Sequence, residues 1–364
     1  MKAGSSHGGN VYAAARETGR PVHRLVDFSA SINPLGPSPR AIRAIASALP
    51  QILHYPDPDC LALRGALAKR LGLTPESLMI GNGSSEIIHL LPAALSIRHA
   101  LIVGPTFSEY ARAMAAAGGR ISLVNATRED RYRPPLTRVR SMILTGRPHI
   151  DAVFLCNPNS PTGRSLAVEL LMELLQAASY QGLWVVIDET FVDYCEDLSV
   201  ISQVGRNFRL IILRSFTKFY ALPGLRIGYA AGTPEVILRI RKRQPPWSVN
   251  SLAQVAALAG LEDRGHARKS LAFMQEERRR LITGLKSLPG VVVFPSAANF
   301  LLVELPRNLT AARCIDALRR HGMLVRECLL KDGFNSRTIR MAVRTPAQNQ
   351  RLLTALRRLL KDSM

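Results

Sequence analysis

Cysteine is scarce in this chain, and the few residues it has are scattered over the 364 positions. None of them forms a CxxC pair or joins histidine in a cluster with metal-ligand spacing. This argues against a disulfide framework and gives no sign of a metal site. An odd, dispersed set is typical of reduced thiols, so we expect a cytoplasmic protein. The five are Cys60, Cys156, Cys195, Cys314 and Cys328.

Long apolar segments are also absent. No apolar run approaches the roughly 18 residues that a membrane-spanning helix requires. The opening, MKAGSSHGGN, lacks the apolar region of a signal peptide. We therefore expect neither export nor a membrane partner.

Acidic residues are outnumbered, with 27 against 48 lysines and arginines, which gives a net charge of +21. Such an excess favours anionic partners, namely nucleic acid, a membrane surface or phosphorylated metabolites. The basic residues are spread along the chain, and the densest runs, at 239–243 and 277–280, are typical of solvated helix faces. No zinc-finger spacing or basic-aromatic motif is present, so we expect small phosphorylated molecules rather than nucleic acid.

The chain alternates short apolar strands with helices. Strands are expected at 78–80, 100–103, 152–155, 184–187 and 210–213, with helices between most of them. This pattern predicts an α/β fold with a mostly parallel central sheet covered by helices on both faces. After residue 234 the pattern changes to a smaller α+β domain. We expect an N-terminal arm at 1–40, a large domain at 41–248 and a small domain at 249–364.

Polar clusters follow the predicted strands, where sites in open α/β sheets form. They are Gly83-Ser84-Ser85, Thr106-Phe107, the NPNSPTG stretch at 157–163, Asp188-Glu189 and Ser215 to Lys218. Each cluster alone could be a capped helix, a turn or a strand end. Their coincidence at strand ends is the strongest physical indication of one shared site.

The clusters together supply what pyridoxal 5′-phosphate needs. Lys218 can form a Schiff base with its aldehyde, and Asp188 can keep its ring nitrogen protonated. Phe107 can face the ring, and Asn159 can donate to the phenolic oxygen. The phosphate needs amides, hydroxyls and an arginine, which Ser84, Ser85, Ser215, Thr217 and Arg226 offer. In the arm, His7, the Gly8 amide and Asn33 are either donors over a pocket or parts of a covering segment.

The motifs NPNSPTG, VVIDETF and LRSFTKFYALPGLRIGY resemble the fold-type I aminotransferase superfamily, which depends on pyridoxal phosphate, over nearly the whole chain. SHGGNVYAAARETG, DFSASINPLGP, HYPDPD, QPPWSVN and RMAVRTPAQNQRLL are similar to the L-threonine-O-3-phosphate decarboxylase branch of cobalamin biosynthesis. Histidinol-phosphate aminotransferases share the core motifs but not the HGGN opening.

The resemblance implies a role for each matching residue. Lys218 would be the Schiff-base lysine, Asp188 the partner of the ring nitrogen and Phe107 the stacking residue. Tyr55 would reach the cofactor phosphate of a neighbouring subunit, which implies a homodimer with shared sites. Arg340 would bind the substrate carboxylate, and His7, Gly8, Asn33 and Arg326 would bind its phosphate.

Two positions depart from the family pattern. Ser160 stands where asparagine commonly precedes Pro-Thr-Gly, and Phe191 stands where tyrosine is common. Both changes affect the donors to the phenolic oxygen, so either Asn159 or Ser160 could make that contact.

The resemblance in the arm implies decarboxylation of L-threonine O-3-phosphate to (R)-1-amino-2-propanol O-2-phosphate. A histidinol-phosphate aminotransferase is the alternative. A non-catalytic DNA-binding protein on the same fold is disfavoured, because the lysine, aspartate and arginine set is complete.

Overall fold

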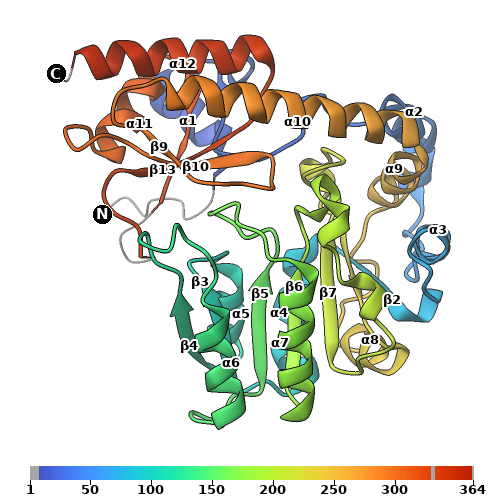
Figure 1. Cartoon of the computed structure of the whole chain (residues 1–364). Coiled ribbons are helices and arrows are strands. Elements are labelled where there is room, and N and C mark those ends of the chain that lie inside the picture. The colour runs from blue at the N-terminus through green and yellow to red at the C-terminus, as the bar shows by residue number, and fades with distance from the viewer. Residues whose placement is uncertain (1–7, 329–332, 363–364) are drawn as a thin grey trace.

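The computed structural model describes residues 8–328 and 333–362. Within these residues the large domain contains a sheet of order β2-β8-β7-β6-β5-β3-β4 (Figure 1). Its strands are β2 (Leu78–Gly81), β3 (His99–Gly104), β4 (Arg120–Asn125), β5 (Ala152–Cys156), β6 (Trp184–Asp188), β7 (Leu210–Ser215) and β8 (Gly228–Ala231). All neighbours pair in parallel except β8, which runs antiparallel to β7 and β2. The predicted α/β class with a mostly parallel sheet is confirmed.

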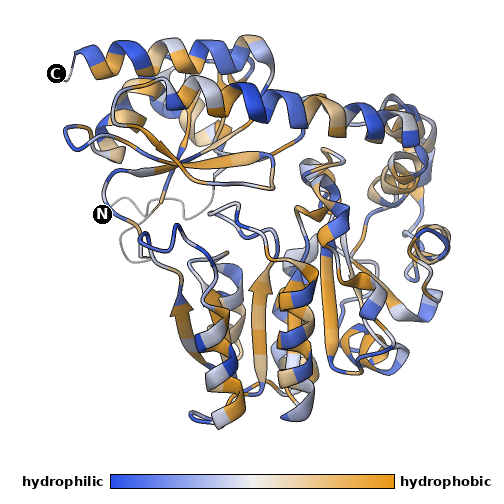
Figure 2. Ribbon diagram, viewed as in Figure 1, coloured by the Kyte–Doolittle hydropathy of each residue, from blue (hydrophilic) through white to orange (hydrophobic). Residues whose placement is uncertain are grey.

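Helices cover both faces of this sheet, because alternate residues of each strand point to opposite sides. Leu155 and Ile187 face one core with α6 (Leu136–Thr145) and α7 (Val168–Tyr180). Phe154 and Val186 face another core with α4 (Ser84–Leu95), α5 (Glu109–Ala116) and α8 (Pro234–Arg241). Two buried faces explain the continuous apolar runs of these strands, which appear orange in Figure 2.

Three elements of the large domain were not predicted from the sequence: β4, α6 and β8. The strand β4 lies at the sheet edge and has mostly exposed or half-buried residues, so it carries no apolar run. The strand β8 is four residues long and consists of glycine, tyrosine and two alanines. It pairs with β7, the strand just before it in the chain, and with β2, which is distant in the sequence.

The small domain is built on a second sheet, of order β12-β13-β10-β9, whose strands all pair antiparallel. The strands are β9 (Val292–Val293), β10 (Phe300–Glu304), β12 (Arg326–Glu327) and β13 (Thr338–Ala342), and the helices are α10 (Arg264–Lys286), α11 (Ala311–Arg320) and α12 (Pro346–Lys361). They share one apolar core, to which Phe28 of the N-terminal arm also belongs.

The described part of the arm attaches to this domain. The helix α1 (Val11–Thr18) packs on α11, where Glu17 pairs with Arg319 at 2.9 Å. The strand β1 (Val26–Asp27) pairs in parallel with β11 (Met323–Leu324). The helices α2 (Pro39–Ala48), α3 (Leu61–Leu71) and α9 (Ser251–Glu262) pack together, and α9 buries its apolar side in the core of the large sheet. The division at residues 40 and 248 stays a prediction.

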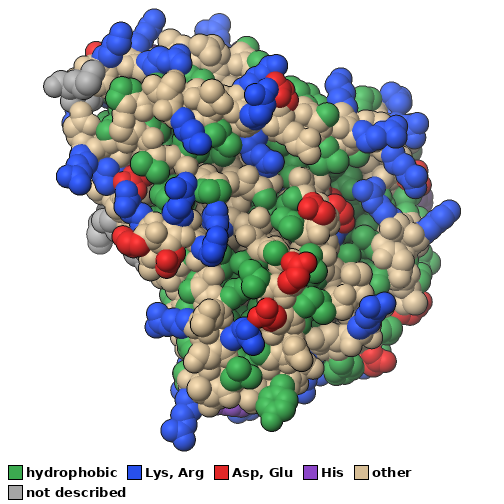
Figure 3. All heavy atoms as spheres, in the orientation of Figure 1, with side chains coloured by type: hydrophobic (Ala, Val, Ile, Leu, Met, Phe, Trp, Pro, Cys, Tyr) green, Lys and Arg blue, Asp and Glu red, His purple; other side chains and the backbone are tan. Residues whose placement is uncertain are grey.

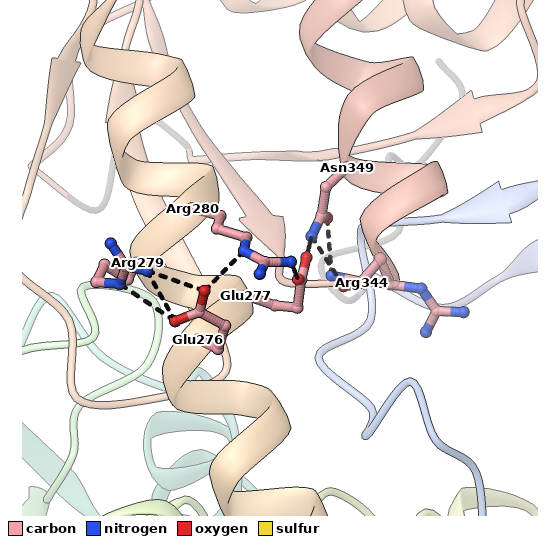
Figure 4. Close-up of polar contacts among 6 residues, drawn as sticks. All are labelled: Glu276, Glu277, Arg279, Arg280, Arg344 and Asn349. Atoms are coloured by element: carbon pink, nitrogen blue, oxygen red, sulfur yellow. Dashed lines mark hydrogen bonds and ion pairs between the residues drawn. The ribbon is translucent and has the colours of Figure 1, made fainter.

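A polar network fixes the end of β13 (Figure 4). The buried carboxylate of Glu277 in α10 accepts from Asn349 of α12 at 3.2 Å and from Arg280 at 3.0 Å. The Asn349 side chain also bonds both the amide and the carbonyl of Arg344. These contacts hold the turn that follows the strand carrying Arg340.

Basic side chains are distributed over the whole visible face rather than gathered in one stripe (Figure 3). In the described ranges, none of the helices combines the length and apolar character that crossing a bilayer would demand.

Candidate active site

A pocket of about 370 Å³ opens where the carboxyl ends of β6 and β7 face the small domain. Eleven of the predicted site residues line it: Gly8, Ser84, Ser85, Phe107, Asp188, Ser215, Thr217, Lys218, Arg226, Arg326 and Arg340. They come from the arm, from the large sheet and from two strands of the small domain. The fold therefore brings residues as distant in sequence as Gly8 and Arg340 into one cavity.

Asp188 lies at the end of β6 with its carboxylate buried. One oxygen accepts from the Tyr110 hydroxyl at 2.7 Å, and the other accepts from the Thr190 amide at 2.9 Å. Burial raises the pKa of Asp188, while the hydrogen bonds from Thr190 and Tyr110 and the charge of Lys218 oppose that rise. The donors favour the charged form, which a protonated ring nitrogen requires as its partner.

Lys218 follows β7. Its backbone carbonyl accepts a hydrogen bond from the backbone amide of Asn33 at 3.0 Å, which ties this position to the N-terminal arm. Burial, followed by the charges of Arg340, Arg226 and Arg326, lowers the pKa of its amine to about 8, and the charge of Asp188 opposes this only in part. At pH 7 about a tenth of the amine is therefore neutral, far more than for an ordinary lysine. Only the neutral amine can attack an aldehyde.

Hydroxyls and free amides form an anion cradle beside Lys218. The Ser215 and Thr217 hydroxyls lie 2.7 Å apart, and the Thr217 amide donates to Ser215 Oγ at 3.2 Å. The helix α4 begins at Ser84 after Gly83, so no side chain caps its first amides. Its positive end and these amides suit a phosphate.

Glycines make this cradle possible. A Cβ on Gly228 would lie 2.5 Å from the Ser84 amide nitrogen, so β8 and the start of α4 touch through backbone. Gly83 has φ of +80°, and a Cβ there would lie 2.7 Å from the Arg226 guanidinium. Side chains at either position would push the cradle apart.

Arg340 lies on the opposite wall, 4.9 Å above the Phe300 ring. Its terminal nitrogens donate to Ser160 Oγ at 3.0 Å and to the Ser29 carbonyl at 2.7 Å, whereas its buried Nε has no protein partner. Burial, followed by repulsion from Arg326, lowers the pKa of Arg340 to about 9. An anionic ligand would relieve both effects, so this wall is suited to a substrate carboxylate.

The arm closes the pocket over Arg340. The Gly9 amide donates to Ser29 Oγ at 2.9 Å, and Asp27 accepts from the Ser29 amide at 2.7 Å. Gly8 lies so close to Ser29 that a Cβ would come within 2.2 Å of the Ser29 carbonyl oxygen. Close packing therefore requires glycine at position 8, whereas Gly9 has a φ of +92°, which favours glycine for its backbone conformation. His7 lies outside the described residues.

Three predicted residues do not line the pocket. Asn159 is buried and uses its amide on Pro105, Thr162 and Thr106, at 2.7 to 2.8 Å. It ties the loops after β3 and β5 together, while the neighbouring Ser160 lines the cavity. Of the two residues considered for the phenolic oxygen, Ser160 is therefore the one that lines the cavity.

Asn33 is also committed to the protein. Its amide nitrogen donates to the Phe219 carbonyl and to Ser270 Oγ, both at 2.9 Å, and its oxygen accepts from the Leu35 amide. No donor remains for a substrate phosphate in this arrangement. Asn33 instead fixes the segment that covers Lys218.

Tyr55 lies on the surface, 78% exposed, with its ring stacked on Trp247 at a centroid distance of 4.5 Å. Tyr55 does not line the pocket of its own chain. This position is compatible with the predicted contact with a neighbouring subunit, which stays a prediction.

The sequence reading missed several pocket residues. They are Ser29, Ala30, Ser31, Glu109, Arg112, Cys156 and Thr190, together with Tyr110 directly beneath Asp188. Phe107 and Tyr110 stand three positions apart, and their rings meet edge-on at 5.8 Å. No sequence signal distinguished Tyr110 from an ordinary core aromatic residue, because Phe107 precedes the helix in which Tyr110 lies.

The pocket residues fit pyridoxal 5′-phosphate. A neutralisable lysine, a buried carboxylate, an uncapped helix start with two hydroxyls, and an aromatic ring surround one cavity. In addition, the buried Nε of Arg340 has no protein partner and can donate to a second anionic group.

Comparisons with known proteins agree with this site. The family model of aminotransferases of class I and II matches residues 23–356. A threonine-phosphate decarboxylase of Salmonella typhimurium is 37% identical over 98% of this chain and 97% of its own. A histidinol-phosphate aminotransferase of Roseiflexus castenholzii is 38% identical over 94% of this chain and 92% of its own. The crystal structure of the histidinol-phosphate aminotransferase from Clostridium acetobutylicum superposes with a TM-score of 0.86 at 28% identity, covering 93% of this chain and all of that one. The chain therefore belongs to the class I and II aminotransferase family, and its cofactor is pyridoxal 5′-phosphate.

Proposed function

We propose that the protein decarboxylates L-threonine O-3-phosphate to (R)-1-amino-2-propanol O-2-phosphate, a step of cobalamin biosynthesis. The observation that carries the proposal is a small cavity with two arginines, Arg326 and Arg340, on the side away from the anion cradle. About 370 Å³ is near the lower end for small-molecule sites, and this space must hold cofactor and substrate together. A compact substrate with two anionic groups fits these limits.

The cofactor, when bound, supplies an aldehyde that joins the substrate amine and a protonated ring that accepts the electron pair released at Cα. The protein residues then choose the bond that breaks. Arg340 would hold the substrate carboxylate, and Arg326 with the Gly8 amide would hold its phosphate. Asp188 keeps the proton on the ring nitrogen, and the Lys218 amine would return a proton to Cα after carbon dioxide leaves.

The N-terminal arm supports this choice over transamination. Its glycines pack on Ser29, whose carbonyl accepts from Arg340, and so close the cavity on this side. We expect the remaining volume of about 370 Å³ to suit phosphothreonine better than a substrate with an imidazole ring or a second, dicarboxylic substrate. The similarity to a histidinol-phosphate aminotransferase nonetheless makes that activity the second candidate.

One experiment separates the two candidates. Purified protein is incubated with O-phospho-L-threonine without any keto acid, and carbon dioxide and the phosphorylated amine are measured. A parallel reaction contains histidinol phosphate and 2-oxoglutarate, and Lys218→Ala is the inactive control. Gas release in the first reaction alone supports the proposal. Amino transfer in the second reaction without gas release in the first would refute it.

We further propose a homodimer with shared sites. Exposed apolar side chains gather around Tyr55, with Leu53 at 82% and Ile52 at 68% exposure. A second copy over this surface would bury them and bring Tyr55 to the partner's phosphate cradle. Light scattering should give twice the chain mass, and Leu53→Asp should lower it. A monomeric wild-type protein with full activity would contradict the proposal.

A further inference from the structure

The Tyr110 hydroxyl is placed to control the charge of Asp188. We propose that Tyr110 is a positioning residue, which holds Asp188 in its ionised form so that the cofactor ring nitrogen stays protonated. The proposal rests on the pyridoxal phosphate site of the family and not on the choice of substrate or reaction.

The Tyr110 hydroxyl donates to Asp188 and also contacts the Cys156 thiol on the neighbouring strand. Its ring is fully buried in α5, packed edge-on against Phe107 and tilted against Phe154. Its oxygen lies 2.7 Å from Asp188 Oδ2, which is a short hydrogen bond of the kind that a charged acceptor makes. Burial raises the pKa of Tyr110 well above its ordinary value, so the phenol keeps its proton and acts as the donor.

Asp188 needs such donors. Its carboxylate is buried at the end of a strand, where its other protein contacts are the Thr190 amide and hydroxyl. The titratable groups facing it are Tyr110, Cys156 on the neighbouring strand, and Lys218 across the pocket. An ionised carboxylate has about four acceptor positions, so donors from the protein still leave positions open toward the ring nitrogen.

The tyrosine also connects two sides of the ring site. Phe107 lies in the loop before α5 and faces the cavity as the expected stacking residue, and Tyr110 in the first turn of α5 packs against it while its hydroxyl reaches Asp188. Loss of the hydroxyl alone would keep this packing, because phenylalanine has the same ring. The electrostatic and packing roles can therefore be separated by Tyr110→Phe.

The test compares two ligands on the cofactor-free full chain. One is pyridoxal 5′-phosphate, and the other is its analogue with C–H in place of the ring nitrogen. A hydrogen bond to a charged group corresponds to about a tenfold or larger change in affinity. Tyr110→Phe should therefore weaken binding of the natural cofactor about tenfold and leave the analogue unchanged, since the analogue has no ring proton for Asp188 to hold.

A matched control is Tyr194→Phe, because Tyr194 is equally buried but its hydroxyl meets Asn299 instead. It should change neither affinity. If Tyr110→Phe weakens both ligands equally, or neither, the proposal is overturned and Tyr110 only packs. Folding is checked by circular dichroism. Should Tyr110→Phe not fold, Thr190→Val removes another donor to Asp188 and is judged by the same two affinities.

Discussion

Glu189, directly after β6, forms a buried ion pair with Arg214 of β7. We expect this pair to contribute to the free energy of unfolding, because it joins the two strands that carry Asp188 and Ser215. Glu189 is fully buried and Arg214 nearly so. Arg214 Nε and Nη2 lie 3.0 Å and 2.9 Å from Glu189 Oε2, and Nη1 reaches Glu196 at 2.8 Å. The pair joins the residue after Asp188 to the residue before Ser215. We therefore choose Glu189→Leu, Arg214→Met and the double variant as the perturbation.

The magnitude follows from what each variant leaves behind. Removing one partner of a buried pair costs about 3–5 kcal/mol, because the other charge stays uncompensated. Glu189→Leu should fall near the lower end, since Arg214 keeps its half-exposed partner Glu196. Arg214→Met leaves Glu189 with the Ser199 hydroxyl and the Val200 amide only. The double variant removes both charges and should cost less than either single one.

The pH dependence has a definite sign. Burial raises the pKa of Glu189, with Arg214 as the main opposing influence. Without Arg214 the folded-state pKa rises further above the unfolded value. Arg214→Met should therefore lose least stability at low pH, where Glu189 is protonated, and progressively more as the pH rises through the folded-state pKa.

The assay is denaturant unfolding of the cofactor-free variants, followed by circular dichroism and tryptophan fluorescence. Equal slopes would show that the midpoint shifts report stability. A single-variant cost below about 1 kcal/mol, typical of an exposed pair, would refute the reasoning. So would a double variant whose cost equals the sum of the two single costs, because the charges would then act independently.

Four other predictions concern the pocket. The pKa of Lys218 near 8 should make the reaction of cofactor-free protein with pyridoxal phosphate about tenfold faster per pH unit up to that value and level above it; a stopped-flow midpoint near 10.5 would contradict this. For the same reason, the cofactor-free protein should gain stability between pH 8 and 10.5, where the unfolded chain binds the extra proton. Gly228→Ala should weaken cofactor binding and lower the free energy of unfolding by about 1–3 kcal/mol. The control Gly65→Ala, with nothing within 4 Å of the new Cβ, should leave both the affinity and the stability unchanged. Equal effects of the two variants in calorimetry would contradict the role of Gly228 in the anion cradle. Arg340→Lys should lower kcat/KM at least about tenfold, because an ammonium cannot keep the contacts with Ser160 and Ser29 while pairing with a carboxylate. An unchanged kcat/KM would show that Arg340 does not bind the substrate.

The sequence by itself determined the class of fold and the chemical centre of the site. Strands such as β5 and β6 are apolar throughout because both faces are covered, and this pattern is legible without coordinates. Asp188 and Lys218 follow such strands directly, so their meeting at one edge of the sheet could be predicted. The edge strand β4 and the short β8 could not, since β4 is mostly exposed or half-buried and β8 consists of glycine, tyrosine and two alanines, so neither carries an apolar run.

Only the tertiary structure decided which polar residues face the cavity. Asn159 and Asn33 belong to motifs with the right composition, yet neighbouring backbone groups use their amides, and Ser160 takes the place beside Arg340. Tyr110 could be read as an ordinary core residue until its hydroxyl was found under Asp188. Local sequence specifies which strand end a side chain follows. The direction of its hydrogen bonds depends on partners up to hundreds of residues away, which only the folded chain brings together.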